Sequence, residues 1–238
     1  MTHPPEELKE QISRHAMEEL GFALIGVVRS ETFRLHPPVV GSFGREAVFP
    51  HPDEVFPQCR SVIVVAMKTR DDIYDTILYR ERLFAGVYDE IIHHRLYKLC
   101  HFVEDLGFEA RLGEKISYKR AAVLAGIGHV GKNTLITRTD VGSNIRLGVV
   151  LTDADLPADE SNDPFAKTFC GSCQRCIEAC PAGAVTPYSV DFSVCAIPKL
   201  FDASDEQARE WARGLHKHVS TEAVIECNLC QKACPYNQ

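Results

Sequence analysis

The sequence predicts a fold in two parts, an α/β domain over residues 1–157 followed by a small cysteine-rich domain over residues 158–238. Three observations lead to this prediction. The apolar runs 22–28 and 61–67 are typical of strands covered on both faces, because β-branched residues follow one another with little polar interruption. The run 153–163 is acidic and polar, as linkers are. Eight of the ten cysteines lie beyond that run.

The remaining elements follow in chain order. Apolar residues at helical spacing predict an amphipathic helix over residues 4–20, and the segment 30–58, rich in proline, phenylalanine and glycine, predicts loop. Residues 74–106 predict one or two helices. Further along, the patterns predict a strand at 108–112, a helix at 118–125, strands at 134–137 and 145–151, and a helix at 204–215 with Ser204 as its N-cap.

The cysteines beyond the linker have the spacing of iron–sulfur ligands. Residues 170–181 read C-x2-C-x2-C-x3-C-P, the run of a bacterial-type [4Fe–4S] site. A shorter run at 227–235 repeats the pattern without its first cysteine. Zinc also takes C-x2-C pairs, but it requires neither a third cysteine two residues on nor the Cys-Pro endings. Disulfides are disfavoured because no secretory signal is visible at the N-terminus.

The spacing also assigns ligands to two clusters. In two-cluster ferredoxins, the cysteine before the proline ligates the other cluster. Cys195 supplies the ligand that the second run lacks. The first cluster then takes Cys170, Cys173, Cys176 and Cys234, and the second takes Cys180, Cys195, Cys227 and Cys230. Cys59 and Cys100 remain, and we expect them to be small buried apolar residues.

Composition limits the class of protein. The chain has 238 residues and is 45% hydrophobic, so it can bury a full core, and its formal net charge of −7 argues against broad affinity for nucleic acid. No segment approaches the ~20 apolar residues of a membrane-spanning helix. We therefore expect a cytoplasmic protein without membrane contact.

A glycine-rich loop at residues 125–134 suggests two kinds of nucleotide site, and its context argues against both. Gly126, Gly128 and Gly131 spell G-x-G-x-x-G, but that fingerprint follows a strand and opens a helix, whereas here a helix precedes the loop. The loop is also close to a phosphate-binding P-loop, yet Asn133 replaces the hydroxyl residue that binds Mg²⁺. The glycines allow tight turns and a close approach of the backbone to a ligand, and a glycine C-cap with a packing turn is the alternative interpretation.

The order of these motifs resembles a known family. The segment 119–134, then 141–148, then Thr152-Asp153, then the cysteine run resemble epoxyqueuosine reductases, and the related reductive dehalogenases share the same order. Segments 21–26 and 61–65 also look like the start of that family's first domain, so the resemblance covers nearly the whole chain. The longer members continue into a helical-repeat region that helps hold tRNA, and this chain resembles a short form without it.

The resemblance implies a nitroreductase-like α/β domain that holds base-off cobalamin beside a ferredoxin-like domain with two [4Fe–4S] clusters. The reaction would be a reductive elimination, a deoxygenation or a dehalogenation, with electrons from a low-potential donor of the ferredoxin or flavodoxin type. By the same resemblance, cofactor contacts fall on Gly131, Lys132, Asn133, Thr134, Gly142 and Ser143, with His129 facing the cofactor. The acidic charge and the short form argue against a tRNA substrate.

The proton donor departs from the family pattern. Epoxyqueuosine reductases carry an aspartate about a dozen residues before the glycine loop, and this chain has none there. Glu114 or Tyr118 takes that role in our prediction, the tyrosine with a pKa lowered by Lys119 or Arg120. Tyr118 as an ordinary half-buried helix residue is an equal alternative. A second class of function also remains open, a two-cluster electron carrier that reduces a corrinoid protein or flavoenzyme, with flavin or no cofactor in the α/β domain.

Overall fold

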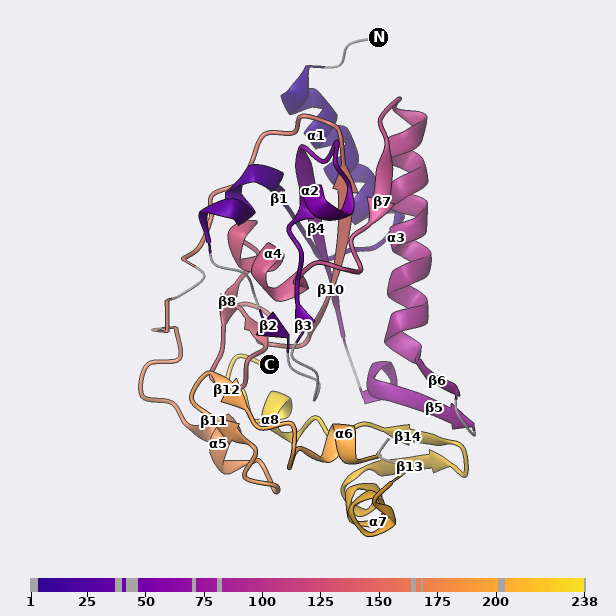
Figure 1. Cartoon of the computed structure of the whole chain (residues 1–238), viewed down its shortest axis with the longest axis vertical. Coiled ribbons are helices and arrows are strands. Elements are labelled where there is room, and N and C mark those ends of the chain that lie inside the picture. Colours follow the sequence, from indigo (N-terminus) through magenta and orange to yellow (C-terminus); the bar gives the residue numbers. More distant parts are fainter. Residues whose placement is uncertain are drawn as a thin grey trace.

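A computed structural model of the chain is shown in Figure 1. It describes residues 4–36, 40–41, 47–69, 72–80, 83–163, 166–167, 169–200 and 204–237. Parts of the predicted loop at 30–58 therefore lie outside the described residues. The described part of that loop holds short elements: a 3₁₀ turn, Ser30–Leu35, the strands β2 (Val40–Gly41) and β3 (Ala47–Val48), and the helix α2 (Pro52–Val55).

The first part is built on a four-stranded sheet in the order β1-β4-β10-β7, with every pair antiparallel. Its strands are β1 (Leu24–Arg29), β4 (Ser61–Lys68), β10 (Ile145–Thr152) and β7 (Ala110–Leu112). All but the last residue of β4 are buried, so the sequence prediction of strands covered on both faces is confirmed.

Alternate residues of β4 enter two separate cores. Ile63 and Val65 pack with α1 (Pro5–Arg14) and α3 (Val87–Asp105), whereas Val62 and Val64 pack with α4 (Tyr118–Leu124). Helices therefore cover both faces, as Figure 1 shows for α3 and α4 on opposite sides of the sheet. The predicted helix at 4–20 is confirmed, with its last turn wound as a π-helix, His15–Glu19.

A second sheet joins the two parts of the chain. Its order is β13-β14-β5-β6, with β5 (Thr76–Arg80) and β6 (Leu83–Gly86) from the first part and β13 (Lys217–Ser220) and β14 (Ala223–Ile225) from the second. The prediction of helix from residue 74 was wrong here, because helix begins only at Val87. The strand partner of β5 lies about 145 residues away, at Ala223–Ile225, where no local pattern reveals it.

Two boundaries also differ from the prediction. Asp205, not Ser204, caps α7 (Glu206–Leu215), since its side chain accepts a hydrogen bond from the main-chain N–H of Ala208. The strand expected at 134–137 is reduced to β9 (Ile136–Thr137), because Thr134 has a φ of +64°, outside the strand region. The other short elements are η3 (Asp72–Asp75), β8 (His129–Val130), α5 (Arg175–Glu178), β11 (Val185–Thr186), β12 (Ser189–Val190), α6 (Ala196–Leu200) and α8 (Leu229–Lys232).

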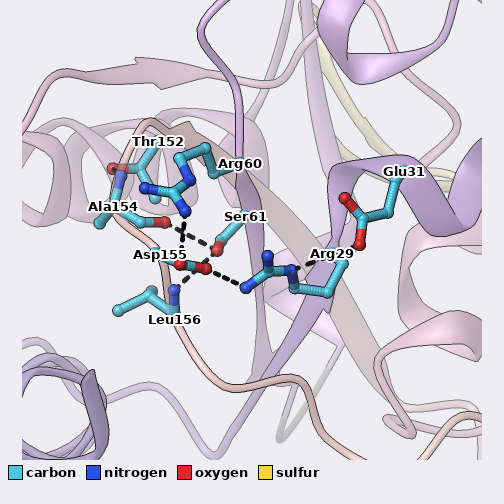
Figure 2. Close-up of polar contacts among 8 residues, drawn as sticks. All are labelled: Arg29, Glu31, Arg60, Ser61, Thr152, Ala154, Asp155 and Leu156. Carbon is cyan, nitrogen blue, oxygen red and sulfur yellow. Dashed lines mark hydrogen bonds and ion pairs between the residues drawn. The ribbon is translucent and has the colours of Figure 1, made fainter.

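The acidic linker is held to the first part along its length. Asp155 forms ion pairs with Arg29 and Arg60, and Ser61 donates to the carbonyl of Ala154 at 2.8 Å, as Figure 2 shows. Further on, a carboxylate oxygen of Asp159 accepts from the main-chain N–H of Val27 at 2.7 Å. These contacts attach residues 154–159 to strands β1 and β4 of the first sheet and to Arg60, which precedes β4. The division at residue 157 stays a prediction.

None of the described helices combines the length and the apolar composition needed to cross a membrane.

Candidate functional site

The structure gathers the eight clustered cysteines into two sets of four. Lining a pocket of about 60 Å³ are Cys170, Cys173, Cys176 and Cys234. Lining a separate cavity of about 480 Å³ are Cys180, Cys195, Cys227 and Cys230. These are the same two sets that the spacing predicts, with Cys180 and Cys234 each grouped with the other run. Their ligation of iron stays a prediction.

Each set is presented by a repeated turn. The N–H of Cys173 donates to the carbonyl of Cys170 at 3.0 Å, and the short helices α5 and α8 then carry the chain to Cys180 and Cys234. Gly171, with a φ of +50°, allows the first of these turns to close. Within the described residues, no three His, Cys, Asp or Glu side chains converge on a single metal ion. A cubane needs no such convergence, because each of its four irons takes one protein thiolate.

The protein alone does not favour the thiolate forms. Burial, and after it the neighbouring Cys227, Cys180 and Cys195, raise the pKa of Cys230 to about 12. Burial and then Cys170 likewise raise the pKa of Cys176. Thiols held together in this way, with the pKa values of Cys176 and Cys230 raised, suit a group that brings positive charge with it, because iron binding releases the protons. The donor sets therefore fit two iron–sulfur clusters.

The glycine loop reaches both sets of cysteines. Lys132 is only 9% exposed, and its ammonium donates to the carbonyls of Gly171 and Cys173, each at 2.8 Å. The amide of Asn133 donates to the carbonyl of Cys230 at 3.2 Å. Gly131 has no room for a side chain, because a Cβ there would lie 2.7 Å from the Thr137 hydroxyl. The loop thus contacts a segment of each set of cysteines.

Three other residues expected at the cofactor also contact the cysteine-rich part. The main-chain N–H of Ser143 donates to Asn237 Oδ1 at 2.6 Å, and Gly142 lies against the same side chain. His129 stacks on Phe169, with 4.9 Å between ring centroids. Lys132, Gly142, Ser143 and His129 do not line the larger cavity, whereas Asn133 and Thr134 do. Their assignment to a cofactor stays a prediction.

Tyr118 faces the larger cavity at the first turn of α4, and Glu114 does not line it. Burial, and after it the charges of Glu114 and Asp89, raise the pKa of Tyr118 to about 12. The predicted lowering by Lys119 or Arg120 was therefore wrong. Glu114 is exposed and lies 3.3 Å from His93 Nε2.

Sequence reasoning missed a charged group at one end of this cavity. Arg146 on β10 forms ion pairs with Asp75 and with Glu226, the residue before Cys227, and stacks over the ring of Tyr88 at 4.6 Å. Asn228 also donates to Asp75, at 2.8 Å. Burial raises the pKa of Glu226 to about 7, with Arg146 opposing the shift. These side chains come from four distant segments, so no local motif signals them.

Comparison with known proteins agrees with the site. Residues 169–237 match the family model of the 4Fe-4S double cluster binding domain. The chain is 28% identical to an epoxyqueuosine reductase of Synechococcus sp., covering 98% of this chain and 76% of the relative. It is 29% identical to one of Gloeobacter violaceus, covering 92% and 73%. The predictions of a double iron–sulfur domain and of an epoxyqueuosine reductase-like enzyme are therefore confirmed.

Solved structures show the same fold. An epoxyqueuosine reductase from Bacillus subtilis superposes with a TM-score of 0.71 and 21% identity, covering 97% of this chain and 65% of that one. A catabolic reductive dehalogenase superposes with a TM-score of 0.63 and 16% identity, covering 99% of this chain and 32% of that one. The chain thus spans about two thirds and one third of these relatives. At such identities the likeness shows the fold alone, and the nitroreductase-like description of the first part stays a prediction.

Proposed function

We propose that this protein is a cobalamin-dependent reductase supplied with electrons by two [4Fe–4S] clusters. One observation carries the proposal: Tyr118 and the second set of cysteines line the same cavity of about 480 Å³. Its volume is in the range of small-molecule and cofactor sites. A source of protons and a source of electrons therefore face one space, as a reductive elimination, deoxygenation or dehalogenation requires. The solved relatives include a reductive dehalogenase described as B12-dependent, with a TM-score of 0.54.

The walls of the cavity suit a corrinoid. Aliphatic side chains of the first part, Leu135, Ile136, Ile145 and Leu147, form one side, and Asn133 and Thr134 lie beside them. His93 also lies on the wall, but Nδ1 is bonded to the carbonyl of Asp89 and Nε2 lies by Glu114, so both nitrogens have partners. Base-off binding without a histidine ligand fits this lining. Bound cobalamin would supply low-valent cobalt as the two-electron reductant.

The two sets of cysteines differ in their access to solvent. Cys170 and Cys173 also border an open surface hollow, whereas the second set faces the cavity. This arrangement suits electron entry from a low-potential donor at the surface and delivery inside. Tyr118, with a pKa of about 12, keeps its proton at neutral pH. It can therefore protonate only a strongly basic group such as a carbanion or an alkoxide. An acid this weak does not give its proton to the reductant before the substrate reacts.

Anaerobic reconstitution tests the proposal. We expect about eight irons per chain after incubation with iron and sulfide, since two [4Fe–4S] clusters hold eight. Titration with hydroxocobalamin, desalting and a visible spectrum should then show a retained base-off corrinoid. Replacing Tyr118 by Phe should leave that retention unchanged and lower turnover by about 10²- to 10⁴-fold. Eight irons with no retained corrinoid would contradict the proposal.

That last outcome would favour the second candidate, a two-cluster electron carrier for a corrinoid protein or a flavoenzyme. The missing aspartate before the glycine loop is the feature that supports it. A flavin titration and reduction of an added corrinoid protein would then be the direct assays.

The first substrate to test is set by the relatives. One epoxyqueuosine reductase was solved with an epoxyqueuosine-modified tRNA-Tyr stem loop. The same stem loop, assayed beside small epoxides and aryl halides, separates a tRNA-directed reductase from a small-molecule one.

A further inference from the structure

Lys132 binds the loop that carries Cys170 and Cys173 of the first set of cysteines. Its ammonium donates at 2.8 Å to the carbonyl of Gly171 and at 2.8 Å to that of Cys173, while its own main-chain N–H lies 3.4 Å from Cys170 Sγ. The residue is 9% exposed, so this cation is largely shielded from solvent. One residue thus brings both a positive charge and an N–H···S hydrogen bond to one set of thiols.

Burying a lysine head is costly unless it is paired or bonded. Neither of the two acceptors is a carboxylate, because both are main-chain carbonyls of the cysteine loop. No ion pair of Lys132 occurs among the described residues. Within the part of the chain that the structure describes, the positive charge therefore has no ion-pair partner, and an anionic cluster on the thiolates of the small pocket that Lys132 also lines would supply the counter-charge.

We propose that Lys132 is a positioning residue that raises the reduction potential of the cluster held by the first set of cysteines. A [4Fe–4S] centre with four thiolates becomes more negative by one charge when it takes up one electron from a ferredoxin-type donor. No bond breaks and no proton moves in this step. A fixed, poorly screened cation stabilises the more negative member of the pair, and a hydrogen bond to sulfur acts in the same direction.

The inference requires the two clusters and not the corrinoid. Residues 169–237 match the double cluster binding domain. The iron content of each preparation shows separately whether both clusters are present. A failure of the cobalamin proposal therefore leaves this one intact, and the reverse holds as well.

Redox titration of the anaerobically reconstituted protein, followed by electron paramagnetic resonance, tests it. Lys132→Gln and Lys132→Met remove the charge and Lys132→Arg keeps it. Lys115→Gln is the matched control, because it removes the same charge from an exposed residue of the same part of the chain. We expect the neutral variants to lower the one-electron reduction equilibrium constant of one cluster about tenfold, which is about 59 mV. Arg should restore most of it, and the other cluster should move less.

The other results are also decisive. Equal shifts of both clusters, or shifts no larger than those of Lys115→Gln, would overturn the proposal. If both neutral variants lose four irons, retention of eight irons by Lys132→Arg would support a need for the charge, since Arg preserves it without preserving the shape. Loss of iron from all three variants would overturn the proposal and leave Lys132 a packing residue.

Discussion

Asn133 donates from its side-chain amide to the main-chain carbonyl of Cys230, 97 residues further along the chain, at 3.2 Å. Its Oδ1 accepts from the N–H of Leu135, and the residue is 5% exposed. Its neighbour Lys132 binds the loop of the other set of cysteines. Two adjacent residues of the glycine loop therefore each bind one cluster-binding segment. These contacts account for the position of the loop beside the cysteines, although its nucleotide-binding motifs are weak.

Replacing Asn133 by Ala should loosen the second cluster-binding segment. The change leaves the carbonyl of Cys230 and the N–H of Leu135 without these partners inside the protein, at a cost of about 1–3 kcal/mol. We expect faster release of iron to a chelator from one of the two clusters. Asn162→Ala is the control, since its amide also donates at 3.2 Å, to the carbonyl of Gly128, away from the cysteines. Equal release rates in the two variants would contradict the prediction.

Gly142→Ala should displace the C-terminal segment that carries Cys234. A Cβ at Gly142 would lie 2.7 Å from the main-chain nitrogen of Asn237, a contact that a change of side-chain rotamer cannot relieve. Gly107→Ala is the control, because Gly107 also has a positive φ but has open space beside it. Both variants should lose a little stability from the backbone strain. Only Gly142→Ala should lower the iron content after reconstitution, and an equal loss from both would attribute the effect to strain alone.

The sequence was sufficient for what depends on local patterns. The spacing of the cysteines predicted the two sets, and the uninterrupted runs at β1 and β4 predicted strands buried on both faces. It was insufficient for β5, whose pairing with β14 joins distant segments, and for Arg146, whose acidic partners Asp75 and Glu226 lie far away in the chain. The pKa of Tyr118 was mispredicted for the same reason, since sequence neighbours do not report burial.

Asp75→Ala should be among the most destabilising single changes near the cavity. Asp75 is buried, pairs with Arg146 and accepts from Asn228, so its removal leaves a buried guanidinium short of a partner. Breaking a buried pair from one side costs about 3–5 kcal/mol. Asp53→Ala, which breaks the exposed pair with Arg34, should cost about 0–1 kcal/mol. Urea denaturation of both variants gives the two values, and a similar small cost for Asp75→Ala would refute the role of the network.

Cys59 and Cys100 should resist alkylation in the folded protein. They are 7% and 6% exposed, and burial raises their pKa values to about 11 and about 12. Reactivity follows the thiolate, so both should stay unmodified at neutral pH. Mass spectrometry after alkylation should show up to eight labels once the clusters are removed, and all ten only after denaturation, since the chain has ten cysteines. Labelling of Cys100 in the folded protein would contradict this prediction.

The stability of the first part should fall as pH drops below about 6.5, through His15. Its ring stacks on Phe102 with 3.8 Å between centroids, and burial lowers its pKa from the ordinary 6.5, with Glu19 opposing the shift. A base whose pKa is lowered by folding takes its proton more readily in the unfolded chain. Above the ordinary value both states are neutral and the effect vanishes, whereas below it protonation favours the unfolded state.

Denaturation of the wild type and His15→Gln from about pH 7.5 to about pH 5.5 measures this effect. At the upper end the wild type should be more stable by a constant, because the variant loses the stacking contact, but the wild type should lose more stability on acidification. The difference between the two curves should therefore narrow steadily below about pH 6.5. Parallel curves over the whole range would show that His15 binds its proton equally in the folded and unfolded chain, and the pH dependence would then have to come from other groups.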